Sequence, residues 1–167
     1  MADEAIDKWI CTWEDIDEMV HQLHRSMLRK QYKPDFIVGI SRGGLVPAIM
    51  LSHIFKVPML PVVWATRDFI DMDRERVKQV QKLVRKQEKN VLIVDDICDT
   101  GATFESFQEY LMEDQCASFA SGVEFCSLYV RYTAEFNPEY WAVEVPDESW
   151  IVFPFETEPQ NHREDRD

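Results

Sequence analysis

The sequence VLIVDDICDTGAT, residues 91–103, indicates the fold more clearly than any other part of the chain. Its first four residues are apolar and three of them are β-branched, which is typical of a strand buried on both faces of a parallel sheet. A run with helical spacing, residues 104–112, follows the stretch. This order predicts a central strand, then a loop at its carboxyl end, then a helix, and therefore an α/β fold.

The loop in this stretch combines two kinds of chemistry. Residues 100–103 contribute hydroxyls, a glycine and the free amides of a helix start, and such amides, together with the helix dipole, favour a bound phosphate. Asp95, Asp96 and Asp99 stand directly before them. These carboxylates would repel a phosphate unless they face hydroxyl groups or a metal ion. The loop therefore predicts a ligand with a phosphate at one end and a polyol or cation at the other, as in ribose 5-phosphate. The alternative is a solvated acidic turn after an ordinary strand.

All thirteen positions of the stretch resemble the 5-phosphoribosyl-1-pyrophosphate (PRPP) motif of the type I phosphoribosyltransferases. The resemblance implies an α/β fold with a twisted, mainly parallel sheet, flanked by helices and completed by a small hood from the N-terminal and C-terminal segments. It implies that Asp95 and Asp96 bind the ribose hydroxyls, that Asp96 lies near Mg²⁺, and that Asp99 acts beside purine N7 as general base or hydrogen-bond partner. It also implies that the 5-phosphate is bound by Thr100, Gly101, Ala102 and Thr103.

A second loop with anion-binding chemistry follows a predicted strand at residues 36–40 and precedes an apolar helix at residues 45–55. The loop consists of Ser41, Arg42, Gly43 and Gly44. Its glycines let backbone amides approach an anion, and Arg42 offers a planar fork of donors that suits pyrophosphate. It resembles the pyrophosphate loop of the same family, which carries a non-proline cis peptide, here expected within residues 41–43. The alternative is a tight turn between strand and helix.

Residues 65–74 have mixed charge and weak periodicity, which indicates a mobile loop. In phosphoribosyltransferases the corresponding segment closes over the active site, where it keeps water away from a cationic sugar. The resemblance therefore implies that Arg67 and Arg74 reach pyrophosphate when this loop closes.

The segment at residues 145–156, VPDESWIVFPFE, resembles the end of the xanthine-guanine and archaeal hypoxanthine phosphoribosyltransferases. In that subgroup a tryptophan stacks on the purine and the next residue offers backbone groups to its edge, which implies these roles for Trp150 and Ile151. A tryptophan of the core is the alternative. The subgroup's lysine, a donor to the oxygen at purine C6, is replaced by Arg131, nineteen positions before Trp150 (150 − 131 = 19). An arginine there can still read a 6-oxo group or accept a different base.

The other elements follow from the spacing of apolar residues. Thr12 is the predicted N-cap of a helix whose apolar stripe runs from Ile16 to Met27. A basic run within residues 77–89 alternates with apolar residues and indicates a helix with a solvated basic face. Pro61 indicates that its strand lies at an edge of the sheet. Further strands are predicted at residues 9–11, 57–64, 123–131 and 140–145.

Composition and charge limit the class of protein. The 167 residues, 46% hydrophobic and 29% charged, suit a single soluble domain, predicted over residues 1–156, with a polar tail at 157–167 that is expected to be disordered. Because no apolar run has the length of a membrane span and the acidic N-terminus is not a secretory signal, a cytoplasmic setting is expected.

The net charge of −13 disfavours nucleic acid and anionic membranes as partners. The scattered cysteines are expected to be reduced: Cys11, Cys98, Cys116 and Cys126.

The predicted function is a Mg²⁺-dependent transfer of 5-phosphoribosyl from PRPP to an oxopurine, namely guanine, xanthine or hypoxanthine. The expected partners are PRPP and a purine base, without nucleic acid or membrane, and the expected assembly is a homodimer or homotetramer. Two alternatives remain. One is a PRPP-binding regulatory protein with the same fold, although such proteins normally add a DNA-binding domain for which this chain lacks length and basic surface. The other is a phosphoribosyltransferase for another base, such as adenine, orotate or a pyrimidine.

Overall fold

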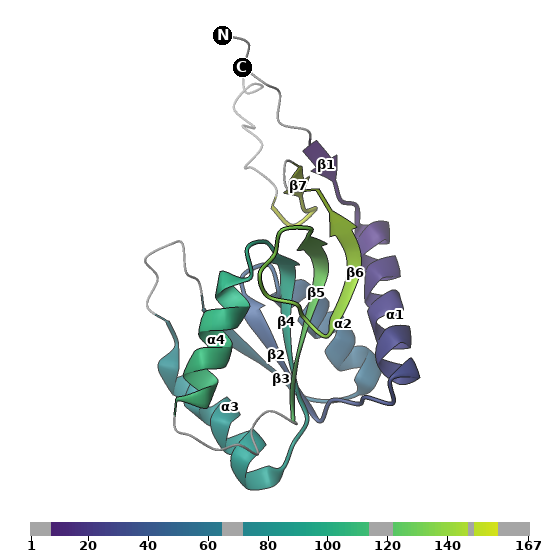
Figure 1. Ribbon diagram of the computed structural model, residues 1–167. Helices are drawn as coiled ribbons and strands as arrows, with labels where there is room; N and C mark the ends of the chain where they lie inside the picture. The colour runs from purple at the N-terminus through teal and green to yellow at the C-terminus, as the bar shows by residue number, and fades with distance from the viewer. Residues whose placement is uncertain (1–7, 65–71, 114–121, 147–148, 157–167) are drawn as a thin grey trace, which may run out of the picture.

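The computed structural model describes residues 8–64, 72–113, 122–146 and 149–156. Helices cover both faces of a central sheet, and a small two-stranded sheet stands beyond one end of it (Figure 1). In chain order the elements are β1 (Lys8–Ile10), α1 (Trp13–Arg29), β2 (Phe36–Ser41), α2 (Leu45–Phe55), β3 (Met59–Val63), α3 (Arg74–Gln87), β4 (Val91–Cys98), α4 (Ala102–Met112), β5 (Val123–Arg131), β6 (Tyr140–Val145) and β7 (Trp150–Val152).

The central sheet has five strands in the order β3-β2-β4-β5-β6, and each neighbouring pair is parallel. The predicted central strand is confirmed, because β4 lies in the middle and its residues from Val91 to Val94 have no exposed surface. The edge position predicted for Pro61 is also confirmed, since β3 ends the sheet and Pro61 is exposed. A proline suits an edge because it has no N–H to donate to a neighbouring strand.

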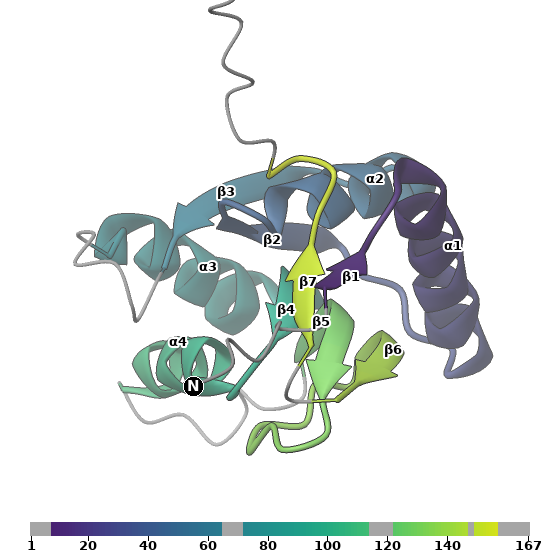
Figure 2. The same ribbon diagram turned by 90° about the horizontal axis from the view of Figure 1, so that it is seen from above.

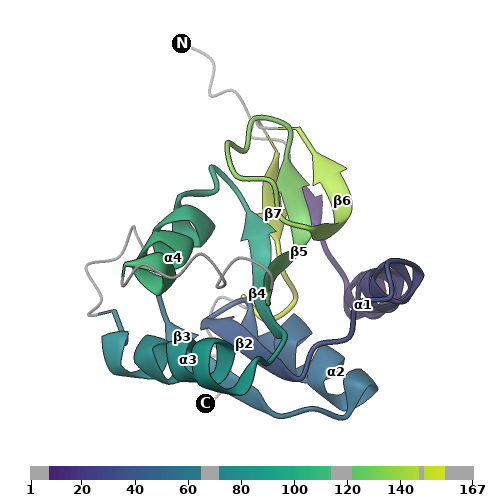
Figure 3. The same cartoon turned by 60° about the horizontal axis from the view of Figure 1, so that its bottom comes forward.

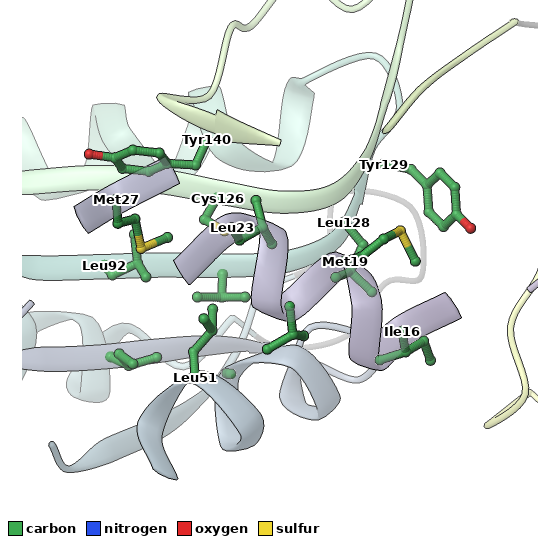
Figure 4. Close-up of a cluster of buried hydrophobic side chains, with 14 of the residues drawn as sticks. Ile16, Met19, Leu23, Met27, Leu51, Leu92, Cys126, Leu128, Tyr129 and Tyr140 are labelled. Atoms are coloured by element: carbon green, nitrogen blue, oxygen red, sulfur yellow. The ribbon is translucent and has the colours of Figure 1, made fainter. Parts of the chain in front are cut away.

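One face of the sheet is covered by α1 and α2. Thr12 caps α1 as predicted: its hydroxyl accepts from the amide of Asp15, and its own amide donates to the Asp15 carboxylate at 2.8 Å. The apolar stripe of α1 is buried against β4, β5 and α2 (Figure 4). Its members are Ile16, Met19, Val20, Leu23 and Met27.

The opposite face is covered by α3 and α4, so that the sheet runs between two pairs of helices (Figure 3). Val77, Val80 and Val84 of α3 are buried, whereas Lys78 and Lys82 are exposed. The predicted basic outer face of this helix is therefore confirmed for these two lysines. Arg85 departs from it, because its Nη2 reaches the backbone oxygen of Leu111 on α4 at 3.4 Å.

The small sheet pairs β1 with β7 in parallel, with Lys8 beside Trp150 in register. It lies over the carboxyl ends of β4 and β5 when the molecule is seen from above (Figure 2). This sheet joins the N-terminal and C-terminal parts of the chain, as expected for the hood.

The strand β7 was not predicted, because three residues are too few to show a period of two. The predicted strand at residues 57–64 is shorter in the structure, where β3 spans Met59–Val63.

Three of the four cysteines, Cys11, Cys98 and Cys126, are buried free thiols, as predicted. Cys116, most of the predicted loop at residues 65–74, and the tail at 157–167 lie outside the described residues. Within the described ranges, no helix combines the length and the hydrophobicity needed to cross a bilayer.

Candidate functional site

Two loops meet at the carboxyl edge of the sheet. Because β2 and β4 are adjacent and parallel, the loops that follow them emerge on the same side. Gly43 lies so close to Asp96 that a Cβ on the glycine would overlap the Asp96 carboxylate. A Cβ on Gly44 would lie 2.5 Å from the backbone oxygen of Val94 and 2.7 Å from the Cα of Asp95. The two glycines therefore allow a contact between the loops that no residue with a side chain permits.

The second loop has the backbone feature expected from the family resemblance. The peptide bond between Ser41 and Arg42 is cis, although neither residue is a proline. Arg42 is exposed, and Ser41 is half-buried at the end of β2. The guanidinium of Arg42 is thus open to a ligand at this edge.

Asp95 and Asp96 form a half-buried carboxyl pair at the end of β4. The amide of Asp96 donates to Asp95 Oδ1 at 2.9 Å, and the amide of Ile97 donates to Asp96 Oδ1 at 2.9 Å. Burial, and after it the charge of Asp96, raises the pKa of Asp95 well above its ordinary value. Burial also raises the pKa of Asp96, against the opposing effect of its hydrogen bonds. A cation or a pair of hydroxyl donors at this site would favour the ionised form of both groups.

A further carboxylate, that of Glu156, acts on this pair through its charge. Its negative charge contributes to the raised pKa of Asp96. The turn that holds it is closed by two hydrogen bonds with Phe153: the Phe153 amide donates to Glu156 Oε2 at 3.3 Å, and the Glu156 amide donates to the Phe153 oxygen at 3.1 Å. Glu156 was not among the residues predicted from the sequence. The sequence feature that could have indicated it is its position at the end of residues 145–156, the segment that resembles the end of the phosphoribosyltransferase subgroup.

The predicted phosphate cradle lies at the start of α4. Gly101 has a φ of +93°, a conformation that a glycine adopts without steric cost, and the amide of Ala102 donates to Thr100 Oγ1 at 3.3 Å. The N-cap of α4 is Gly101, which has no side chain to accept from the first turn, so the helix dipole and the amides that follow Ala102 are available to an anion. Residues 95–104 line a pocket of about 180 Å³. The structure therefore places the predicted cradle and the three acids in one pocket.

Asp99 and Arg131 are joined by a short ion pair. Arg131 Nε donates to Asp99 Oδ1 at 2.6 Å, and Arg131 Nη1 donates to the backbone oxygen of Pro146 at 2.8 Å. The side chain of Arg131 is only 12% exposed, and that of Asp99 is 33% exposed. Both residues were predicted at the base site, but their direct contact was not. The end of β5 is thus connected to the loop after β4 through charged side chains.

The tryptophan of β7 is not part of the core. Trp150 is 58% exposed, whereas the next residue, Ile151, is buried and lies beside Trp9 in the two-stranded sheet. The alternative of a core tryptophan is therefore wrong.

Two arginines were predicted to reach pyrophosphate, Arg67 and Arg74. Arg74 begins α3, and its guanidinium lies 5.7 Å from the centre of the Tyr110 ring, so it contacts α4. Arg67 lies outside the described residues.

The donors at this edge suit Mg²⁺ better than a softer metal. Carboxylate oxygens are hard ligands, and Mg²⁺ is usually bound by one or two carboxylates together with substrate phosphates. Asp95 and Asp96 offer such oxygens beside the cradle. Among the described residues, the structure contains no group of three or more His, Cys, Asp or Glu side chains able to hold a metal by themselves. The residues therefore fit a metal that is shared with a phosphorylated ligand.

An amide cradle and a carboxyl pair at the carboxyl edge of a parallel sheet define an α/β protein that binds a phosphorylated sugar or nucleotide. The family model described as phosphoribosyl transferase domain matches residues 4–162, and the chain belongs to this family. The expected recognition, fold class and transferase activity are thereby confirmed.

Individual relatives agree with this family. The xanthine-guanine phosphoribosyltransferase of Nitratidesulfovibrio vulgaris strain Hildenborough is 27% identical over 150 residues, which cover 89% of this chain and 85% of the relative. The enzyme of the same name from Idiomarina loihiensis is 27% identical over 152 residues, with 89% and 87% covered. The crystal structure of a purine phosphoribosyltransferase from Pyrococcus horikoshii is similar with a TM-score of 0.70 and 30% identity, covering 92% of this chain and 96% of that one.

Proposed function

We propose that the protein transfers 5-phosphoribosyl from PRPP to a 6-oxopurine, namely guanine, xanthine or hypoxanthine, in purine salvage. The products are a nucleoside 5′-monophosphate and pyrophosphate. The observation that carries this proposal is the direct contact of Gly43 and Gly44 with Asp96 and Asp95, because it joins a pyrophosphate-type loop to a sugar-phosphate loop. The names of the relatives from N. vulgaris and P. horikoshii support a purine as the acceptor.

The phosphoribosyl end of PRPP would bind in the pocket lined by residues 95–104. Its volume of about 180 Å³ is below the range of roughly 300–1,000 Å³ that is usual for a whole drug-sized ligand, so it suits one end of PRPP. Asp95 and Asp96 would accept hydrogen bonds from the ribose hydroxyls. The 5-phosphate would be bound by the cradle residues Thr100, Gly101, Ala102 and Thr103.

The pyrophosphate end would bind at the neighbouring loop. The proposed pyrophosphate ligands are Ser41, Arg42, Gly43, Gly44 and Arg67. Asp96 would hold Mg²⁺. When bound, this ion neutralises charge on the departing pyrophosphate. In a chain with a net charge of −13, the guanidinium of Arg42 supplies local positive charge for the same purpose.

The base would lie between Trp150 and the Asp99–Arg131 pair. The exposed indole of Trp150 can stack on a purine, and backbone groups of Ile151 would contact the edge of the base. Arg131 presents donors and Asp99 an acceptor, which match the O6 acceptor and the N7–H donor of an oxopurine. Adenine carries an amino group at C6 and would place a donor against Arg131. An unmatched buried donor costs about 1–3 kcal/mol, so we expect oxopurines to be preferred.

The reaction would need no covalent enzyme intermediate. A ring nitrogen of the base attacks C1 of the ribose, the bond between C1 and pyrophosphate breaks, and the purine N–H proton passes to Asp99 as general base. Asp95 and Asp96, when ionised, stabilise the positive charge that develops on the sugar.

The test is a spectrophotometric assay with PRPP and Mg²⁺ against guanine, xanthine, hypoxanthine, adenine, uracil and orotate. We expect turnover with at least one oxopurine and a much lower rate with adenine. PRPP binding without turnover of any base would favour the regulatory alternative, and a preference for orotate or uracil would overturn the choice of substrate.

We further propose that residues 1–156 act as one catalytic domain, in the cytoplasm, as a homodimer or homotetramer. The proposed partners are PRPP and a purine base only. Light scattering coupled to gel filtration measures the assembly directly, and a monomer at micromolar concentration would contradict this part of the proposal.

A further inference from the structure

The connection between β5 and β6, residues 132–139, contacts the cradle from outside the PRPP motif. The amide of Glu135 donates to the backbone oxygen of Thr100 at 3.0 Å. A Cβ on Gly101 would lie 2.5 Å from the Cβ of Phe136 and 2.7 Å from its nitrogen. Cys98 Sγ donates a long hydrogen bond of 3.6 Å to the Phe136 oxygen. The backbone of residues 135–136 therefore lies directly against the residues that form the cradle.

The ring of Phe136 fixes this connection to the core. It is half-buried, and its centre lies 5.5 Å from that of Phe104 and 5.0 Å from that of Phe125, with an edge-to-face arrangement in the second pair. Phe104 belongs to the first turn of α4 and lines the pocket, while Phe125 belongs to β5. Edge-to-face aromatic pairs add stability beyond the burial of their area. The ring thus connects the helix that follows the cradle with the strand that carries Arg131.

The cradle needs such support because of its own composition. Gly101 has the largest backbone freedom of any residue type, so its φ of +93° is one of many conformations open to it. Ordering a free backbone on binding weakens the affinity for a ligand, because fixing one residue costs about 1–2 kcal/mol. The contacts from Glu135 and Phe136 order Thr100 and Gly101 before a ligand arrives.

We propose, on the basis of the function proposed above, that Phe136 is a positioning residue for the 5-phosphate of PRPP. Its ring holds residues 135–136 against Thr100 and Gly101, and these in turn hold the cradle amides in the conformation that binds phosphate. The effect belongs to PRPP binding and not to the base, since Arg131 is held separately by Asp99 and Pro146.

The test compares Phe136→Leu and Phe136→Tyr with a matched control, Phe107→Leu. Phe107 is fully buried in the same hydrophobic cluster, where it packs edge-to-face on Trp64, so its replacement reports a general loss of core packing. For Phe136→Leu we expect the KM for PRPP to rise about tenfold, equivalent to about 1.4 kcal/mol. We expect kcat and the KM for the base to stay within about twofold. Phe136→Tyr keeps the ring and should retain the KM of the wild-type protein.

Calorimetric titration with PRPP in the presence of Mg²⁺ separates failure of this role from failure of the proposed function. A wild-type protein that neither binds PRPP nor turns over any base would contradict the proposed function. An active wild-type protein with equal PRPP affinities for Phe136→Leu and Phe107→Leu would overturn the role of Phe136. Should Phe136→Leu fail to fold by circular dichroism, Phe136→Met offers an unbranched, flexible side chain that can adapt to the space left by the ring, and an unchanged PRPP affinity in that variant would overturn the role equally.

Discussion

The two halves of β4 serve opposite purposes. From Val91 to Val94 the strand is apolar and without exposed surface, whereas Asp95 and Asp96 are half-buried carboxyl groups whose pKa values are raised by burial. The first half stabilises the fold through burial of apolar area. The second half keeps acids in surroundings that disfavour their charge, which lowers the stability of the ligand-free protein at neutral pH. One strand thus carries both the centre of the core and a site that the core has to support.

The largest effect is expected from Asp99→Asn, in the loop that directly follows the acidic half of β4. The amide cannot accept a proton from the base, so kcat should fall about 10²-fold to 10⁴-fold, while PRPP affinity changes little. Steady-state kinetics with the best oxopurine, together with calorimetric PRPP binding, measure both quantities. Unchanged turnover would remove Asp99 from the chemistry.

The apolar half is tested by Leu92→Ala. Leu92 has no exposed surface and packs in the cluster that faces α1, so we expect a loss of about 2–5 kcal/mol in the free energy of unfolding. The KM values of the folded protein should stay close to wild type. Urea denaturation followed by kinetics on the native fraction measures this difference. A selective loss of PRPP binding with normal stability would contradict the division of β4 into two halves.

The next effect is expected at the end of β5, from Arg131→Met compared with Arg131→Lys. Methionine leaves Asp99 without the ion pair and removes the donors facing the base, so the KM for the oxopurine should rise about tenfold to a hundredfold. Lysine restores a cation and should give a smaller rise. The measurement is the KM for each base at saturating PRPP. Equal KM values in all three proteins would exclude Arg131 from base recognition.

The smallest effect is a gain in stability for Asp95→Asn. Because the pKa of Asp95 is raised in the folded protein, the stabilisation by its protonated form is complete below the unfolded pKa of about 3.9 and is lost as pH rises through the folded value. The neutral amide avoids this loss. Relative to wild type, the ligand-free variant should therefore gain stability at pH 8 and gain less at pH 5.

Thermal unfolding at the two pH values measures this gain, and Glu109→Gln, at an exposed position of α4, serves as the control. The same Asp95→Asn variant should bind PRPP poorly. A variant that is less stable than wild type at pH 8 would show that the Asp95 carboxylate supports the fold, contrary to the comparison within β4.

The sequence predicted β4, the edge strand β3 and the capped helix α1, because each depends on spacing within a short window. It also predicted an anion-binding loop after each of β2 and β4, whereas the pairing of these two strands, which brings the loops to one edge, comes from the structure. It did not predict β7, whose pairing with β1 joins residues 8–10 to 150–152. It missed the electrostatic effect of Glu156 on Asp96 and the contact of Phe136 with Gly101, because the residues of each pair are distant in the chain.

Local sequence is sufficient to predict the chemistry offered at the sheet edge: amides and hydroxyls after β4, a glycine-rich loop after β2, and an aromatic residue near the C-terminus. These features follow from residue type and periodicity, which depend on neighbours along the chain. Which of these groups touch depends on the packing of the whole fold. The Asp99–Arg131 pair joins residues 32 positions apart, and such contacts depend on how twisted strands and their connections pack, which no short window of sequence contains.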